Sequence, residues 1–298
     1  MTGKIIVIVG PTGSGKTGLA VKIGKKFGGE IISADSRQIY RGLKIGSNYP
    51  SDKELKSVPH HLIGFVDPKN NFTVAEYQKK AFHIINILKK KNKIPIICGG
   101  TGFYVRSITD GTVMPTVPPD EKLRNNLENK TIESLDEILK NLDKKRWGNI
   151  DLKNKRRVIR AIEIASVLGR VPDIEHRPPK ENILKIGIDI PKNKLKKSIE
   201  TRAKSMLRSG LIKETKKLVS SGIGIKKINE LGFEYKDVLR YINGEIKTKA
   251  ELIDLLVLDT MHYVKRQITW FKKDKNIHWV MSDNEAKKII DRFLSDTL

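Results

Sequence analysis

The sequence is short of cysteine, of long apolar runs and of acidic residues, and each shortage narrows what the protein can be. Cys98 is the only cysteine, so no disulfide can form within the chain and a reducing compartment is compatible. No apolar run approaches the length of a membrane span, so we expect no membrane partner and a cytoplasmic protein. Asp and Glu number 34 against 58 Lys and Arg, and the formal net charge of +24 favours a polyanionic partner.

The positive charge is spread along the whole chain. Residues 1–112, 113–180 and 181–298 carry net charges of +11, +4 and +9. This distribution favours a basic surface on a folded body over a disordered basic tail, although a lysine-rich composition bias of the source organism would look the same.

Buried strands alternate with helical patterns over most of the chain, which is typical of an α/β fold. The strands are predicted from four apolar runs, Ile5–Val9, Glu30–Ala34, Ile94–Cys98 and Leu184–Ile190. Capping boxes at Thr73–Glu76 and Thr248–Glu251 predict the starts of two helices. The second helix is expected to continue to about Phe271.

The middle of the chain has a different character. Prolines cluster just after Gly111 and again at Pro179, and the charged stretch between them has a helical pattern without a strand-like run. We therefore expect a catalytic core in residues 1–112 and 181–298, with an inserted all-helical subdomain in residues 113–180.

A glycine-rich loop follows the first predicted strand. Its residues are Gly10, Pro11, Thr12, Gly13, Ser14, Gly15, Lys16 and Thr17. The spacing Gly-x-x-x-x-Gly-Lys-Thr between a strand and a helix predicts a P-loop that surrounds a diphosphate, with Lys16 on the outer phosphate and Thr17 on Mg²⁺. The parallel sheet should then be like that of the P-loop NTPases. Nothing in this geometry requires a nucleoside, so the rest of the ligand stays open.

Two strand ends carry candidate catalytic groups. Asp35 follows the second strand, at the edge where open α/β sheets bind ligands. It can hold a metal ion, accept a proton from a nucleophile, or only cap the following turn. The third strand ends in Gly99-Gly100-Thr101, whose glycines permit close approach of another segment and whose hydroxyl stands at an expected helix start. A hydrolase would more often have an acid at this strand end.

Three arginines lie close together in the insertion. Arg156, Arg157 and Arg160 fall on neighbouring faces of one predicted helix, opposite its apolar side, and only Glu163 is near enough to pair with them. Guanidinium groups bind phosphates and stack on bases, so this row suggests RNA or another large anion. A solvated helix face is the alternative interpretation.

Seven short motifs occur in order between residues 10 and 270. They are Gly10–Thr17, Asp35-Ser36 with Ile39-Tyr40, Ile45-Gly46, Pro59-His60, Gly99-Gly100-Thr101, Arg157-x-x-Arg160-Ala161 and Lys265-Arg266-Gln267-x-Thr269-Trp270. Together they resemble the tRNA dimethylallyltransferase family. The resemblance implies transfer of a dimethylallyl group from dimethylallyl diphosphate to N6 of adenosine-37 in tRNA. The loop would then bind the diphosphate of an isoprenoid, not ATP.

The resemblance also implies roles for single residues. Asp35 would accept the N6 proton as general base, Thr101 would orient the reacting group, and Mg²⁺ on Thr17 would help the diphosphate to leave. The implied tRNA contacts are Asp35, Ser36, Arg37, Gln38, Thr101, Arg124, Arg156, Arg157 and Arg160. The insertion would clamp the anticodon stem-loop, and we expect a monomer.

One segment departs from the family pattern, and other classes of protein stay open. Ser47-Asn48-Tyr49-Pro50 stands where the family usually has Thr-Ala-Lys-Pro, which leaves open the isoprenoid accepted or a contact near the RNA but keeps the diphosphate and base roles. A small-molecule kinase of the nucleoside monophosphate type, a non-catalytic RNA-binding protein and an isopentenyltransferase acting on free adenylate are the alternatives. His60-His61 is expected to pack or form hydrogen bonds rather than bind metal. Trp270 and Trp279 could stack on bases, but Trp270 lies near the apolar face with Tyr263 and Ile268, so its burial in the core is the favoured expectation.

Overall fold

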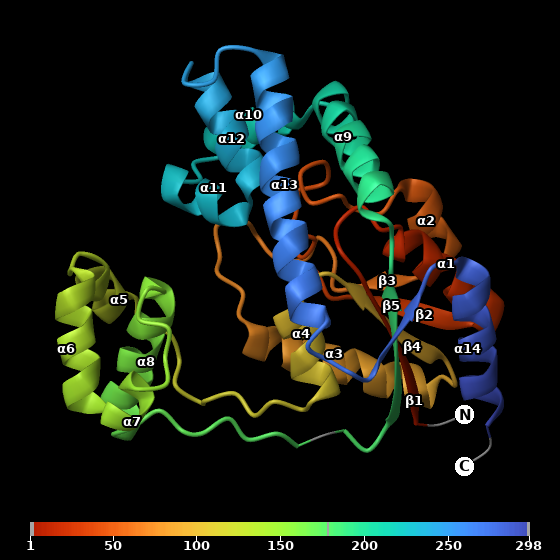
Figure 1. Ribbon diagram of the computed structural model, residues 1–298, viewed down its shortest axis with the longest axis horizontal. Coiled ribbons are helices and arrows are strands. Elements are labelled where there is room, and N and C mark those ends of the chain that lie inside the picture. The colour runs from red at the N-terminus through yellow and green to blue at the C-terminus, as the bar shows by residue number, and fades with distance from the viewer. Residues whose placement is uncertain (1–2, 178, 297–298) are drawn as a thin grey trace. The chain divides into compact units, whose positions relative to one another are not determined.

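The structure is a computed structural model that describes residues 3–177 and 179–296 (Figure 1). The chain divides into two compact units, Met1–Gly111 with Pro178–Leu298 and Thr112–Arg177, which we call the core unit and the helical unit. Within the described residues, no helix combines the length and the apolar character needed to cross a membrane.

Six parallel strands form the sheet of the core unit. They are β1 (Lys4–Val9), β2 (Gly29–Ser33), β3 (His60–His61), β4 (Ile94–Gly99), β5 (Asn182–Ile188) and β6 (Ile277–Val280). Their order is β3-β2-β4-β1-β5-β6, and every neighbouring pair is parallel. The four predicted strands are confirmed, whereas β3 and β6 are too short to give an apolar run. Because β1 lies between β4 and β5, the loop after it opens at the middle of the carboxyl edge.

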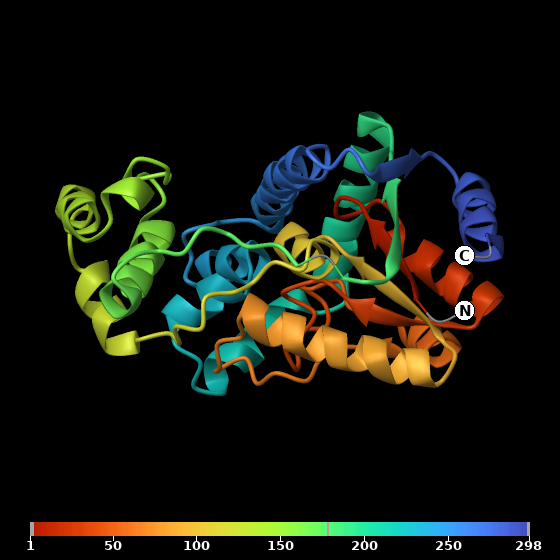
Figure 2. The same ribbon diagram turned by 90° about the horizontal axis from the view of Figure 1, so that it is seen from below.

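Helices cover both faces of this sheet. Other helices of the core unit pack with one another instead. The described helices of this unit are α1 (Lys16–Phe27), α2 (Asp52–Ser57), α3 (Val74–Lys90), α4 (Gly102–Thr109), α9 (Lys192–Arg208), α10 (Leu211–Ser220), α11 (Ile225–Leu231), α12 (Phe233–Ile242), α13 (Lys249–Phe271) and α14 (Asp283–Ser295). Alternate residues of β1 point to opposite faces, so Ile5 and Val7 pack with α3 and α4, and Ile6 and Ile8 pack with α1 and α14 (Figure 2). Each such buried side chain contributes about 1.5–3 kcal/mol of transfer free energy.

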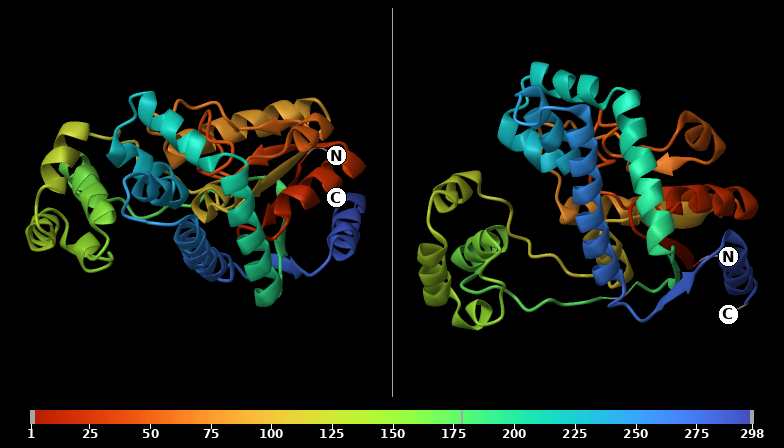
Figure 3. Two further views of the ribbon diagram at one scale, coloured as in Figure 1. Left: turned by 90° about the horizontal axis from the view of Figure 1, so that it is seen from above. Right: turned by 45° about the horizontal axis from the view of Figure 1, so that its top comes forward.

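Both predicted capping boxes are confirmed. Thr73 caps α3 and Thr248 caps α13, in each case with the glutamate three residues later bonding back to the cap. An N-cap of this kind stabilises a helix by about 1 kcal/mol. Helix α13 ends at Phe271 as predicted, and it packs beside α9 and α12 around a second apolar cluster that includes Leu43 and Tyr235 (Figure 3).

The helical unit has a hydrophobic cluster of its own. Its described helices are α5 (Glu121–Glu128), α6 (Ile132–Leu142), α7 (Lys144–Trp147) and α8 (Lys155–Leu168). Leu135 and Leu139 of α6 pack against Val158 and Ile162 of α8, and all four side chains are buried. The exposed face of α8 is therefore the face that carries Arg156 and Arg157.

Candidate active site

The glycine-rich loop joins β1 to α1. Gly13 and Gly15 have φ angles of +86° and +85°, in the left-handed region that favours glycine. The Ser14 N–H donates to the Pro11 carbonyl at 3.2 Å and closes the loop. Gly15 is the N-cap of α1 and offers no side chain, so the first N–H groups of this helix are left for an anion.

Neighbouring elements hold this loop in place. The Gln267 side chain of α13 accepts the Thr12 N–H at 2.9 Å and donates to the Gly100 carbonyl at 2.9 Å. Ser198 of α9 donates its hydroxyl to the Gly13 carbonyl at 3.1 Å. The loop is thus fixed in shape by groups from α9, α13 and the end of β4.

Lys16 reaches into the interior beside this loop. Burial lowers the pKa of its ammonium group, and the nearby Asp35 carboxylate works in the opposite direction. Its Nζ donates to the Pro11 carbonyl at 3.5 Å, at the limit of a hydrogen bond. A desolvated ammonium group with so weak a partner favours binding of a phosphate oxygen.

A small cavity beside the loop gathers charged and hydroxyl side chains from separate elements. They include Lys16, Thr17, Asp35, Arg37, Arg202, Glu234 and Tyr263. Asp35 accepts the Arg37 N–H on Oδ1 at 2.9 Å, so it does cap its turn. The turn uses one carboxylate oxygen, and the same carboxyl group lines the cavity with Lys16 and Thr17. The geometry therefore permits a turn cap and a proton acceptor in one residue.

Thr101 connects the ends of β2 and β4. Its hydroxyl accepts the Ser36 N–H at 3.0 Å and lies 3.3 Å from the Ser36 hydroxyl, and its own N–H donates to the Ala34 carbonyl. A Cβ on Gly99 would lie 2.1 Å from the Ala34 carbonyl oxygen, so only glycine allows this approach. The close approach predicted for these glycines is confirmed, and Thr101 stands at the start of α4 as expected.

Arg37 and Gln38 have partners inside the core unit. Arg37 pairs with Glu234 and stacks on the rings of Phe233 and Tyr263, 4.6 and 5.1 Å from their centroids. Burial opposes its charge, but Glu234 and its neighbours raise the pKa of the Arg37 guanidinium. Gln38 accepts from the Ser33 hydroxyl and donates to the Asn48 carbonyl, so it ties β2 to the following loop.

Arg202 is a site residue that the sequence analysis missed. Burial lowers the pKa of its guanidinium, the carboxylates of Glu234 and Asp35 work against this, and Arg37 adds to it. Its Nε has no hydrogen-bond partner among the described residues. A buried, unsatisfied guanidinium N–H beside a phosphate loop indicates a place for an anionic ligand. Its position on the helix could have indicated this role, because Arg202 follows the buried residues Leu195 and Ile199 of α9 at helical spacing.

A glutamate of α10 shapes another wall of the cavity. Glu214 accepts the backbone N–H groups of Lys44, Ile45 and Gly46 at 2.9–3.1 Å and the Tyr235 hydroxyl at 2.8 Å. The segment held in this way continues into Ser47 and Asn48, which line the cavity. Glu214 is a second site residue that the sequence analysis missed, and it gives no sequence signal because most of its partners are backbone groups.

The departure from the family pattern lies just beyond this wall. Tyr49 points to Gly64, where an added Cβ would lie 2.5 Å from the tyrosine hydroxyl. Gly64 has a φ of +57°, so glycine is favoured there for its backbone as well. Tyr49 is not among the described residues that line the cavity with Lys16 and Asp35. Its side chain therefore packs against the turn at Gly64.

In the helical unit, two of the predicted RNA contacts share a buried carboxylate. Glu163 has a 1% exposed side chain and pairs with both Arg124, at 2.9 Å, and Arg160. Arg160 also donates to the Val117 carbonyl at 2.7 Å. Arg156 and Arg157 are exposed on α8. Arg124 and Arg160 therefore stabilise the unit, and the exposed guanidinium groups of α8 come from Arg156 and Arg157.

Two further expectations have different outcomes. His60 and His61 form hydrogen bonds, as predicted, with the Val58 carbonyl at 2.8 Å and the Glu30 carboxylate at 2.7 Å. Burial of Trp270 in the core is wrong, because the side chain is 36% exposed. Its indole lies over Gly102 at the edge of a cavity instead.

Comparisons with known proteins agree with this geometry. Residues 38–274 match the family model described as IPP transferase. The chain is 38% identical to the tRNA dimethylallyltransferase of Acetivibrio thermocellus, covering 96% of this chain and 95% of the relative, and 39% identical to that of Leuconostoc citreum, covering 96% of each.

Solved structures are also similar. The full-length tRNA isopentenylpyrophosphate transferase of Bacillus halodurans matches 98% of this chain and 95% of its own, with a TM-score of 0.71 and 33% identity. A eukaryotic dimethylallyltransferase acting on tRNA shares the fold, with a TM-score of 0.81 at 21% identity over 98% of this chain and 80% of its own. With a phosphate loop, a facing carboxylate and relatives of this kind over nearly its whole length, the chain belongs to the IPP transferase family.

Proposed function

We propose that the protein transfers a dimethylallyl group from dimethylallyl diphosphate to N6 of adenosine-37 in tRNA. The observation that carries this proposal is the cavity that Lys16 and Thr17 of the phosphate loop share with Asp35. A site that binds a leaving diphosphate and a group that accepts a proton thus lie within one small volume. Family membership supports the same reaction.

The leaving diphosphate is the first requirement of this chemistry. When the bond between the allylic carbon and the diphosphate oxygen breaks, the electron pair goes to the diphosphate. We expect Lys16, the loop N–H groups and Arg202 to stabilise that charge, since Lys16 and Arg202 line the same cavity. Because these groups are held in position before the substrate binds, they need little reorganisation during the reaction.

The nucleophile is the second requirement. The exocyclic amine of adenine is weakly nucleophilic, and its N6 forms the new bond to the allylic carbon as a proton leaves. We assign that proton to the Asp35 carboxylate, with Thr101 orienting the base through the network that links it to Ser36. The adenine must leave its stack first, which costs a few kcal/mol and is offset by contacts to the extruded nucleotide.

Mg²⁺ fits this site as a companion of the diphosphate. It prefers oxygen ligands and commonly binds through one or two protein oxygens together with substrate phosphates. The Thr17 hydroxyl lines the cavity, and the described residues contain no cluster of three or more His, Cys, Asp or Glu side chains that could form a separate cage. When bound, the ion would neutralise part of the charge on the diphosphate.

The RNA contact in the helical unit is assigned to its exposed arginines. We expect Arg156 and Arg157 to bind phosphates of the anticodon stem-loop, with the protein acting as a monomer. Each Arg→Ala should then flatten the plot of log K against log salt by somewhat less than one unit. Arg177→Ala is the matched control, because Arg177 is an exposed arginine of the same unit that lies outside α8. Equal slopes for all variants would limit Arg156 and Arg157 to a solvated face.

The acceptor atom provides the test of this reaction. The protein is incubated with dimethylallyl diphosphate, Mg²⁺ and an anticodon stem-loop, and the RNA product is analysed by mass spectrometry. Replacing the target adenine by guanine should abolish the product, because Asp35 would then face a carbonyl oxygen without an N6 proton. Modification of the guanine variant at the same rate would contradict the assignment of N6.

A further inference from the structure

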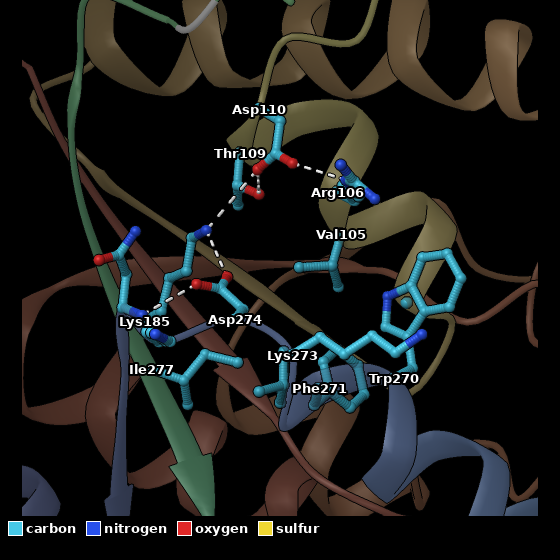
Figure 4. A pocket seen from close by; sticks show the side chains of 14 residues that line it. Val105, Arg106, Thr109, Asp110, Lys185, Trp270, Phe271, Lys273, Asp274 and Ile277 are labelled. Carbon is cyan, nitrogen blue, oxygen red and sulfur yellow. Dashed lines mark hydrogen bonds and ion pairs between the residues drawn. The ribbon is translucent and has the colours of Figure 1, made fainter. Parts of the chain in front are cut away.

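A second, larger cavity lies in the core unit beside the candidate active site. It encloses about 660 Å³ and is lined by α4, β5, the end of α13 and the turn that follows (Figure 4). This volume is within the range of about 300–1,000 Å³ that small-molecule sites occupy. Its lining residues are different from those of the Lys16 cavity, but it includes Gly102, the residue directly after Thr101.

Trp270 gives this cavity an aromatic wall. The indole lies so close to Gly102 that an added Cβ there would be 2.1 Å from the indole Cδ1, so the glycine makes room for the ring. Val105, Phe271 and Ile277 add apolar surface. An indole that stays 36% exposed beside an apolar surface is suited to stacking on a planar group.

The same cavity carries an excess of positive charge. Lys185 is balanced by Asp274 at 2.6 Å and Asp110 at 3.7 Å, and Figure 4 shows this group on the side opposite the indole. Arg106 is half exposed and uses only Nε to pair with Asp110. Lys273 and Lys275 are exposed and form no ion pair with any described residue.

We propose that this cavity binds one nucleotide of the RNA substrate other than the target adenosine. Its base stacks on Trp270, and its phosphate lies near Arg106, Lys273 and Lys275. This proposal rests on the proposed function, because it takes RNA as the substrate. A planar aromatic group with an attached anion is the chemistry that an exposed indole with neighbouring cations recognises. The direct connection through Gly102 to Thr101 favours a nucleotide near the reacting one over an unrelated metabolite.

Equilibrium binding tests this proposal without relying on catalysis. The affinity of a fluorescent anticodon stem-loop is measured by anisotropy for Trp270→Ala, Trp270→Phe and Lys273→Glu. Loss of base stacking should weaken binding by about tenfold in Trp270→Ala and by less in Trp270→Phe, since phenylalanine keeps an aromatic face. Lys273→Glu should also weaken binding, whereas Lys288→Glu, an exposed lysine of α14, should not. Circular dichroism and thermal melts confirm that each variant is folded.

A double-mutant cycle locates the nucleotide. Stem-loops with an abasic site at one loop position are compared with the parent on wild-type protein and on Trp270→Ala. At the position that occupies the cavity, the two losses should not add, because each removes the same stacking contact. Additive losses at every position, or wild-type affinity in Trp270→Ala, would overturn the proposal. Direct binding of adenosine monophosphate is the second arm. If Trp270→Ala weakens the binding of this nucleotide but leaves the affinity of the stem-loop unchanged, the cavity is a site for a free nucleotide and the proposal is overturned. Failure of the prenyl transfer itself would leave RNA binding measurable, so the two failures are distinguishable.

Discussion

Replacing Arg202 with methionine should separate catalysis from stability. The guanidinium lies in the cavity with Lys16 and Asp35, burial already works against its charge, and its Nε has no partner among the described residues. If this group stabilises the leaving diphosphate, its removal should lower kcat by about 10²–10³, the effect of deleting one preorganised donor. Methionine has a similar length and brings no unsatisfied N–H, which relieves a cost of about 1–3 kcal/mol. The melting temperature should therefore stay constant or rise.

The assay is single-turnover transfer at saturating RNA and donor, together with a thermal melt of the same preparation. Arg208→Met is the matched control, because Arg208 is an exposed arginine at the end of the same helix. Its rate and melting temperature should match those of the parent protein. A slower Arg202→Met that also melts at a much lower temperature would assign Arg202 to the structure of α9, and an unchanged rate would remove it from the site.

Three further predictions follow from single hydrogen-bond networks. Asp35→Asn keeps an Oδ1 that can accept the Arg37 N–H but loses the carboxylate that accepts the proton. The single-turnover rate should therefore fall by about 10², with an unchanged circular dichroism spectrum. A rate within a few-fold of the parent would leave Asp35 as a turn cap. Glu214→Gln weakens the hydrogen bonds from the backbone of residues 44–46, so the KM for dimethylallyl diphosphate should rise several-fold. Tyr235→Phe removes only the hydrogen bond from Tyr235 to Glu214, so it should raise the KM by less. Burial opposes the charge of Glu163, but hydrogen bonds from Arg124, the Asp120 N–H and Arg160 outweigh it and lower the pKa of this carboxyl. The stability that Glu163 contributes is thus present above the usual pKa of about 4.5, and it is lost as the pH falls through the lower pKa of the folded state. In thermal melts over this acid range, Glu163→Gln should lose less stability than the parent protein. Parallel curves of melting temperature against pH would contradict this role of Glu163.

The parts of the fold that could be predicted are those fixed by local patterns. Apolar runs of five or more residues identified β1, β2, β4 and β5, and the capping boxes at Thr73 and Thr248 gave the first turns of α3 and α13. Strand β3 contains only His60 and His61, so its pairing with β2 comes from tertiary contacts and not from periodicity.

The candidate site was predicted only where its residues belong to sequence motifs. The loop, Asp35 and Thr101 follow strands and could be found from spacing. Arg202 and Glu214 lie on helices far along the chain, and only the packing of α9 and α10 brings them to the cavity or its wall. The exposure of Trp270 was not predicted, because its position near apolar neighbours on the helix favours burial. Its indole packs on Gly102 and stays exposed to solvent instead.

The central claim is that the phosphate loop holds an isoprenoid diphosphate from which carbon is transferred. The most direct measurement is the mass of an anticodon stem-loop after incubation with the protein, Mg²⁺ and either dimethylallyl diphosphate or ATP. We predict that the RNA gains one five-carbon unit with dimethylallyl diphosphate and remains unchanged with ATP, which can occupy the loop but offers no allylic carbon. A gain of one phosphoryl group with ATP, or unchanged RNA in both mixtures while ADP accumulates, would contradict the account and favour a kinase.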